Sequence, residues 1–597
     1  MNKDKQGWNQ FRRIRLDRKA LARRARRIEG TTRRHAHRFI IRRIQNVRAV
    51  RRQITLWLTM IGFIIAGLGL QWMWGQSNYM VSARQGGGSY VEASLGPITT
   101  LNPLYISSSA EATVGRLVFS SLYDYDETGS LHQDIAASLQ VDSTGKQYTI
   151  KLKPNVTWHD GAPLTAKDIV FTINLIKNPL SRSSLRINWL DVSVQAIDAT
   201  TVQFSLPTVY AAFPYALTFP ILPEHILTSV SPGAVRENIF SQSPVGSGPF
   251  RFKSLQSADV LTGTRRVTLE ANKNYYRGQP KLDRFEVQAY TSEEAILSAL
   301  KSGEVNGAAD ISITSRSQIP SNYTVAPQPL DSGVYLLLNT THPVLRDSKV
   351  RKALQYATDT DAIRARLGEG TLSLDSPFID GQLTGADTPH APKTDLTKAK
   401  ALLDEAGWKA EGSYRIKDGK PLELTITTTK SSEYGAVLEE IVKQWQALGI
   451  KVNTRTVDTA TVSSTFVQDT LQGRNFDVLL YQLSIGADPD VYAYWHSSQA
   501  GPSGYNFTSY SNKTADASLA SARSRLEPDL RNAKYKQFAR QWIEDAPAIG
   551  LYQPVAEYVS NKNAQTVRSN AKLVTSTDRL ATVIYWTVES DMVYKTP

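Results

Sequence analysis

The chain has 597 residues, with 69 lysines and arginines against 55 aspartates and glutamates, and it has no cysteine. The lack of cysteine excludes disulfides, thiolate metal sites, cysteine nucleophiles and a lipid-modified N-terminal cysteine. Hydrophobic residues make up 41% of the chain, which is typical of a globular protein and, at this length, of several domains or lobes.

The positive charge is concentrated in residues 1–53, which hold 19 lysines and arginines and three acids. The net charge is therefore +16 for this arm and −2 for residues 54–597. This balance argues against a basic nucleic-acid surface on the body, and no nucleic-acid partner is expected. We predict a cytoplasmic arm that lies against anionic lipid headgroups. Binding of nucleic acid or a cytoplasmic partner by the arm is the alternative.

An uncharged segment, residues 54–74, follows the arm and predicts a transmembrane helix. At about 1.5 Å per residue it spans roughly 30 Å, the thickness of a bilayer core. Tryptophans lie near both ends, as in an interfacial belt. Arginines precede the segment and the first basic residue after it is Arg84, so the positive-inside rule places the N-terminus in the cytoplasm and the remainder outside. We favour an uncleaved anchor over a cleaved signal peptide or a buried core helix.

Residues 75–88 end in three glycines and predict a flexible tether to a body of residues 89–597. Within the body, Gln147–Leu152 alternates apolar and polar residues, which indicates a strand with one wet face. Thr165 and Asp168 have the spacing of a capping box that begins a helix.

A parallel unit is predicted in the second half of the chain. Leu422, Leu424 and Ile426 alternate along a strand, an amphipathic helix follows and ends at Gly449, and residues 450–457 form the next strand. Strand–helix–strand crossovers are right-handed and cover one face of a sheet. The fold class is therefore α/β.

No catalytic motif emerges from the sequence. It lacks a Gly-x-Ser-x-Gly elbow, a phosphate-binding P-loop and a His-Glu-x-x-His zinc motif. The eight histidines are scattered, and His159, beside a predicted turn, is expected to be structural. We therefore predict no enzyme activity, no metal and no cofactor.

Residues 148–168, which read YTIKLKPNVTWHDGAPLTAKD, resemble the signature of the family 5 solute-binding proteins of ABC importers, the oligopeptide- and dipeptide-binding type. Further matches to this family follow in order along the chain: Thr100–Pro103, Pro244–Phe250, Asn272–Tyr276, Lys301–Val305, Val350–Ile363, Ala401–Trp408 and Ala487–Asp490.

The resemblance implies a two-lobed, periplasmic-binding-protein-like fold with an extra domain, joined by two crossing strands, with the ligand held between the lobes. By this resemblance we expect the extra domain at about residues 123–231 and the second lobe at about residues 336–571. The first lobe would combine residues 89–122, 232–335 and 572–597.

The resemblance also implies four ligand-contacting segments, because peptide-binding members hold the ligand backbone by strand-like hydrogen bonds. The residues expected in these segments are Ser107, Ser109, Asp310, Tyr481, Gln482, Ser484, Asp488 and Tyr552. The structural alternatives are plain loop residues for Ser107 and Ser109, core positions for the two tyrosines, solvent-facing positions for Gln482 and Ser484, and a turn cap for Asp488.

One departure from the family pattern concerns the peptide N-terminus. Members that bind free peptides often carry an aspartate at the position that falls here at Ile485 or Gly486. Neither residue is charged, and an unpaired buried ammonium costs several kcal/mol. The sequence therefore predicts a weak demand for a free N-terminus, with Asp310 or Asp488 as possible substitutes.

The predicted function is that of a membrane-anchored, extracytoplasmic binding protein. It would capture a peptide or similar solute, act as a monomer, and deliver the solute to ABC transporter permease subunits. A surface hydrolase and a ligand sensor that signals through the membrane helix are the alternatives.

Overall fold

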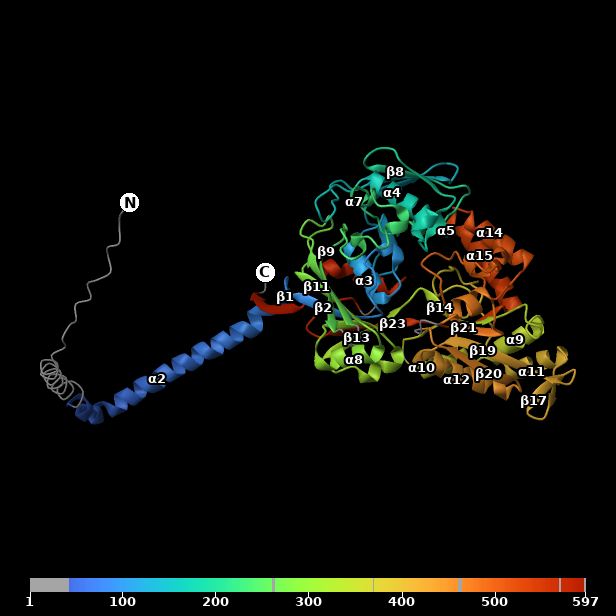
Figure 1. Ribbon diagram of the computed structural model, residues 1–597. Helices are drawn as coiled ribbons and strands as arrows, with labels where there is room; N and C mark the ends of the chain where they lie inside the picture. The colour runs from blue at the N-terminus through green and yellow to red at the C-terminus, as the bar shows by residue number, and fades with distance from the viewer. Residues whose placement is uncertain (1–41, 260–263, 369, 460–463, 569–570, 595–597) are drawn as a thin grey trace, which may run out of the picture. The chain divides into compact units, whose positions relative to one another are not determined.

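Figure 1 shows a computed structural model of the chain, which describes residues 42–259, 264–368, 370–459, 464–568 and 571–594. The chain divides into two compact units. One consists of Met1–Ala83 with Asp591–Pro597, and the other is Arg84–Ser590.

The first unit contains the long helix α2 (Arg42–Tyr79). Its stretch Arg51–Trp74 is long and apolar enough to cross a membrane, and none of it is buried. The helix runs past Trp74 because the next five residues contain no proline and a single glycine. Strand β1 (Met80–Gln85) follows and pairs with β24 (Glu589–Tyr594). Most of the predicted tether is therefore regular structure.

The second unit contains two large sheets, which we call the lobe I and lobe II sheets (Figure 1). The lobe I sheet has seven strands in the order β13-β23-β12-β2-β11-β10-β9, and β2 is parallel to its neighbours β11 and β12. Its strands are β2 (Ser89–Leu95), β9 (Phe250–Asp259), β10 (Thr264–Ala271), β11 (Arg284–Tyr290), β12 (Gly307–Ile311), β13 (Tyr323–Pro329) and β23 (Val555–Asn561).

Helices α3 (Ser109–Val118) and α8 (Glu293–Ser302) contact the lobe I sheet. Along β2, Tyr90 belongs to the core that includes α3, whereas Ala93 belongs to the core that includes α8. Successive side chains of a strand point to opposite faces, so each helix covers its own face.

The lobe II sheet has six strands in the order β15-β22-β14-β21-β19-β20. These are β14 (Ser332–Leu338), β15 (Leu372–Ser373), β19 (Glu423–Thr429), β20 (Lys451–Val457), β21 (Val478–Ser484) and β22 (Ala548–Gln553). Strands β19 and β20 are parallel and joined by α12 (Ser432–Ala447), as the sequence predicts.

Every residue of β14 is buried because the lobe II sheet is covered on both faces. Leu336 packs in the core with α9 (Ser348–Ala357), α10 (Thr360–Leu367), α11 (Leu396–Glu405) and α12. Tyr335 packs in the opposite core with α14 (Lys513–Arg523) and α15 (Pro528–Asp545). This explains the nearly continuous apolar run of β14.

Between α3 and β9 the chain forms an extra domain. Its four-stranded sheet has the order β5-β6-β8-β7, with strands β5 (Ala136–Val141), β6 (Gln147–Leu152), β7 (Ser193–Ala196) and β8 (Thr201–Ser205). Helix α4 (Ala166–Lys177) begins with the predicted capping box between Thr165 and Asp168. A hairpin of β3 (Tyr123–Tyr125) and β4 (Leu131–Gln133) precedes this sheet.

The chain passes between the lobe I and lobe II sheets at two links, Leu330–Asp331 between β13 and β14 and Pro554 between β22 and β23. We call these two links the crossing. Because β23 pairs with β12 and β13, the chain is back in lobe I at Val555. The predicted second-lobe boundary at residue 571 is therefore too late, since nothing local to β23 signals which sheet it joins.

Candidate functional site

The crossing is held together by backbone hydrogen bonds among segments that are far apart in sequence. Leu330 donates to the carbonyl of Pro554 at 3.0 Å, and Asp331 donates to the carbonyl of Leu573 at 2.8 Å. The amide of Gly486, just beyond β21, donates to the carbonyl of Asp331 at 2.8 Å. Two of the four predicted ligand segments, residues 477–485 along β21 and Leu551–Gln553 at the end of β22, therefore run up to the crossing.

The two lobes also meet beside the N-terminus of α12. The hydroxyl of Ser432 in its first turn lies 3.3 Å from that of Ser312 and 3.0 Å from that of Thr314, both from lobe I. Ser312 precedes a short 3-10 helix, Ile313–Gln318, and Ile313 is buried in the lobe II core. The segment that follows β12 therefore touches lobe II directly.

Tyr552, a predicted site residue on β22, is buried, and its hydroxyl donates to Glu433 Oε1 at 2.6 Å. Burial raises the pKa of Glu433, although the hydrogen bond from Tyr552 opposes this. Glu433 lies in the first turn of α12, next to the contact of Ser432 with lobe I. Sequence reasoning missed this carboxylate, because an acid in a first turn usually serves only to complement the helix dipole.

Asp310 lies at an irregular point of β12, where the pairing with β23 shifts register. Its φ of +64° is in the left-handed region, which is costly for a residue other than glycine, asparagine or aspartate. Its Oδ2 accepts a hydrogen bond from the backbone of Leu95 at 3.1 Å. The side chain therefore ties the ends of two neighbouring lobe I strands together.

Ser107 is exposed, and its amide and hydroxyl donate to Glu111 Oε2 at 2.7 and 3.0 Å. Glu111 also accepts from Thr99 and Thr100, and these hydrogen bonds outweigh burial, so the pKa of Glu111 is lowered. Ser109 is the first residue of α3, and no side-chain hydrogen bond engages it within the described residues. The predicted segment is therefore an ordered loop in which Ser107 is already bonded.

Along β21, Tyr481 lies between the rings of Phe466 and Phe507, with ring centroids 6.0 and 6.1 Å away. Gln482 is partly buried and Ser484 is exposed, and neither side chain makes a hydrogen bond within the part of the chain that the structure describes. The carbonyl of Ser484 accepts from the hydroxyl of Tyr494 at 2.5 Å.

The Asp-Pro-Asp loop after β21 engages two arginines of lobe II. Asp488 is buried, and Arg531 of α15 grips both of its carboxylate oxygens at 2.5 and 2.6 Å. Asp490 Oδ2 lies 3.0 Å from Nε of Arg523, at the end of α14. Bidentate arginine–carboxylate pairs are strong and directional, so Asp488 already has its counter-ion.

Arg523 also connects lobe II to the extra domain. Its guanidinium carbon lies 4.7 Å from the ring centroid of Tyr210, and its carbonyl accepts from the amide of Ala211 at 3.0 Å. Nearby, Leu526 approaches the turn at Gly145, where an added Cβ would lie 3.0 Å from its side chain. We call the contacts of Tyr210 and Ala211 with Arg523 the latch, because they join the extra domain to lobe II at a place other than the crossing.

The sequence profile of the bacterial extracellular solute-binding proteins, family 5, matches residues 130–505. The chain belongs to this family. The oligopeptide-binding protein AppA of Bacillus subtilis is 30% identical over 506 residues, which cover 82% of this chain and 90% of AppA.

Solved structures of family members agree with this assignment. AppA from Bacillus subtilis, in complex with a nonapeptide, superposes with a TM-score of 0.69 at 27% identity and covers 85% of this chain and 100% of AppA. NikZ from Campylobacter jejuni, in complex with Ni(L-His), gives a TM-score of 0.71 at 26% identity and covers 84% of this chain and 99% of NikZ. The predicted α/β, two-lobed fold is confirmed.

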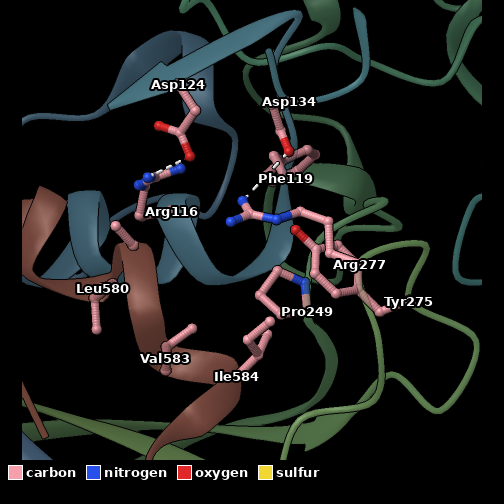
Figure 2. A pocket seen from close by; sticks show the side chains of 11 residues that line it. Arg116, Phe119, Asp124, Asp134, Pro249, Tyr275, Arg277, Leu580, Val583 and Ile584 are labelled. Atoms are coloured by element: carbon pink, nitrogen blue, oxygen red, sulfur yellow. Dashed lines mark ion pairs between the residues drawn. The ribbon is translucent and has the colours of Figure 1, made fainter. Parts of the chain in front are cut away.

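A small charged pocket lies between lobe I and the β3–β4 hairpin of the extra domain. Figure 2 shows Arg116 facing Asp124 and Arg277 facing Asp134, the latter pair 3.6 Å apart. The hydroxyl of Tyr276 donates to Asp134 at 2.5 Å. The cavity among them measures about 20 Å³, enough for a single water molecule.

A larger cavity of about 570 Å³ lies in lobe II and is lined by residues 372–390. Its wall begins at β15, which pairs with β22 next to Tyr552, and Gln382 donates to the carbonyl of Gly486 at 2.7 Å. Its acidic groups are Asp380 and Asp375, which lies 3.1 Å from His390. Within the described residues, no group of three histidines or acids has the geometry of a metal site.

Proposed function

We propose that the chain is a membrane-anchored, extracytoplasmic binding protein that captures peptides or similar solutes and passes them to the permease of an ABC transporter. Hinge closure around the solute would give the permease one conformation to recognise.

One observation carries this proposal. In a chain of the solute-binding family, two predicted contact segments meet where the chain passes between two sheets, and a third touches lobe II through Ser312 and Thr314. The AppA structure from Bacillus subtilis contains a nonapeptide, which supports a peptide as the solute. NikZ contains Ni(L-His), so the family fold also accepts other solutes.

We propose that the side chains of Ser109, Gln482 and Ser484 contact the solute, because none of them makes a hydrogen bond to another described residue. The pairing of β21 with β19 ends at Leu480, so the β21 backbone beyond Leu480 would pair with an extended peptide on that side. The cavity lined by residues 372–390 would receive a peptide side chain, because it is large and lies next to β22.

The proposal includes the anchor. The helix stretch Arg51–Trp74 would span the membrane once, with the basic arm in the cytoplasm on anionic lipid and the body outside. The protein would act as a monomer.

Calorimetric titration of the full chain in detergent with a mixture of random nonapeptides tests the proposal. We expect saturable binding and recovery of every peptide intact after prolonged incubation. Cleaved peptides would favour a surface hydrolase instead, and the absence of binding would contradict the peptide assignment.

A further inference from the structure

Asp331 occupies a special place in the crossing. Its amide is bonded to lobe I at Leu573, and its carbonyl is bonded to Gly486 of lobe II. Gly486 is one of the two positions at which a family acid for a peptide ammonium is expected and missing. The fold therefore brings the backbone of an acidic residue, in the link between β13 and β14, beside the position where the sequence lacks an acid.

The carboxyl group of Asp331 is partly buried and has no fixed partner. Within the described residues it accepts no hydrogen bond and forms no ion pair. The turn at Gly129 of the β3–β4 hairpin packs against it, so that a Cβ added there would lie 3.8 Å from Oδ2. Burying an ionised carboxylate without a partner is unfavourable, and a cation beside it would offset that cost through charge attraction.

The groups around Asp331 are mostly acidic. Burial raises its pKa to about 7, the charge of Lys572 opposes this rise, and the charge of Asp578 adds to it. Tyr125 of β3 is within electrostatic reach of Asp331, Asp578 and Asp488, and burial followed by these charges raises its pKa.

Two arginines of this region are paired with carboxylates, whereas Lys572 forms no ion pair within the described residues. Arg531 grips Asp488 through both carboxylate oxygens. Arg116 pairs with Asp124 and lies 4.0 Å from Asp578. The electrostatic potential near Asp331, with these arginines paired, therefore favours the binding of a cation from the solute.

We propose that Asp331 binds an ammonium group of the solute, so that the protein selects positively charged peptides. This inference rests on the proposed function and reverses the sequence-based expectation of a weak demand for a free N-terminus. The ammonium comes from the peptide N-terminus or from a lysine side chain, and both have the same chemistry.

The affinity for a cationic solute should depend on pH. An ammonium beside Asp331 stabilises the ionised carboxylate, so binding near pH 7 releases a proton. Affinity for a cationic peptide therefore rises as the pH increases through about 7. An uncharged peptide gains nothing from this ionisation.

A competition experiment tests the proposal directly. The full chain in detergent is offered an equimolar mixture of random nonapeptides without lysine, arginine or histidine, half of them N-acetylated, at pH 8. Mass spectrometry of the retained peptides should show at least tenfold enrichment of the free-amine form. A second mixture, acetylated throughout and containing either lysine or norleucine at one position, shows whether a side chain serves equally.

The Asp331→Asn variant should lose the enrichment while still retaining peptides, and in the wild type the enrichment should fall between pH 8 and pH 6. Asp361→Asn, the same chemical change at an exposed position, should behave as the wild type. Thermal unfolding of each variant shows that it is folded. Because the pH series uses only the wild type, an unstable variant leaves the test intact.

Equal retention of charged and uncharged peptides by the wild type, or an unchanged preference in Asp331→Asn, would overturn the assignment of Asp331. Retention of neither form would overturn the proposed peptide binding itself, and the inference with it. The two failures are therefore distinguishable.

Discussion

At the residue scale, His159 of the family signature has a structural role, because both of its ring nitrogens make hydrogen bonds to backbone groups. Its Nδ1 accepts from the amide of Gly246 at 3.2 Å, and its Nε2 lies 3.0 Å from the carbonyl of Gly248. Both glycines pass against the end of α3, where a Cβ at Gly246 would lie 1.9 Å from the carbonyl oxygen of Val118. The expectation of a structural histidine agrees with these contacts.

Burial lowers the pKa of His159 to about 4. The unfolded chain, with a pKa near 6.5, therefore binds more protons between pH 4 and pH 6.5, and the free energy of unfolding should increase with pH across that window. His159→Gln should flatten this increase, by roughly 3 kcal/mol in total. Urea unfolding at several pH values measures it, and an identical pH dependence in both proteins would contradict the assignment.

At the scale of elements, the latch connects the end of α14 to the extra domain through Arg523. Removing its side chain takes away the contact with Tyr210 and the 3.0 Å ion pair with Asp490, but leaves the backbone bond to Ala211. We expect the arrangement in which the extra domain contacts lobe II to become less populated, and the apparent affinity to fall in proportion to that population.

We expect Arg523→Ala to weaken nonapeptide binding about fivefold to tenfold, roughly 1 kcal/mol. Arg525→Ala is the matched control, since the one side-chain hydrogen bond of Arg525 within the described residues goes to Ser521 at 3.3 Å. The chain has no cysteine, so spin labels at introduced cysteines, Ile197→Cys and Tyr414→Cys, report the distance between extra domain and lobe II. An unchanged distance distribution in Arg523→Ala would contradict a role in closure.

How far the sequence predicts these elements depends on how local their signals are. The unit β19–α12–β20 was predictable because its alternation, amphipathic face and terminal glycine lie within one segment. Strand β23 carries no mark of the sheet that it joins, so the lobe boundary was misplaced. Asp331 and Glu433 were missed because only the fold brings them to the crossing and to Tyr552.

At the scale of the whole molecule, the charge distribution separates an arm of +16 from a body of −2. With Arg51–Trp74 as a single span, protease added to intact cells should digest the body and leave the arm protected. Immunoblotting with antibodies against each part measures this. Recovery of the intact body from the medium would instead indicate cleavage after the apolar segment.

The central claim is that this molecule holds an intact solute between its lobes. Native mass spectrometry of the full chain, purified in detergent from cells that express it naturally, tests this most directly. We predict a mass excess that denaturation releases, that fragmentation identifies as intact peptide with a free ammonium group, and that Asp331→Asn diminishes. A chain that carries only cleavage products, or that turns over added peptides, would contradict the account.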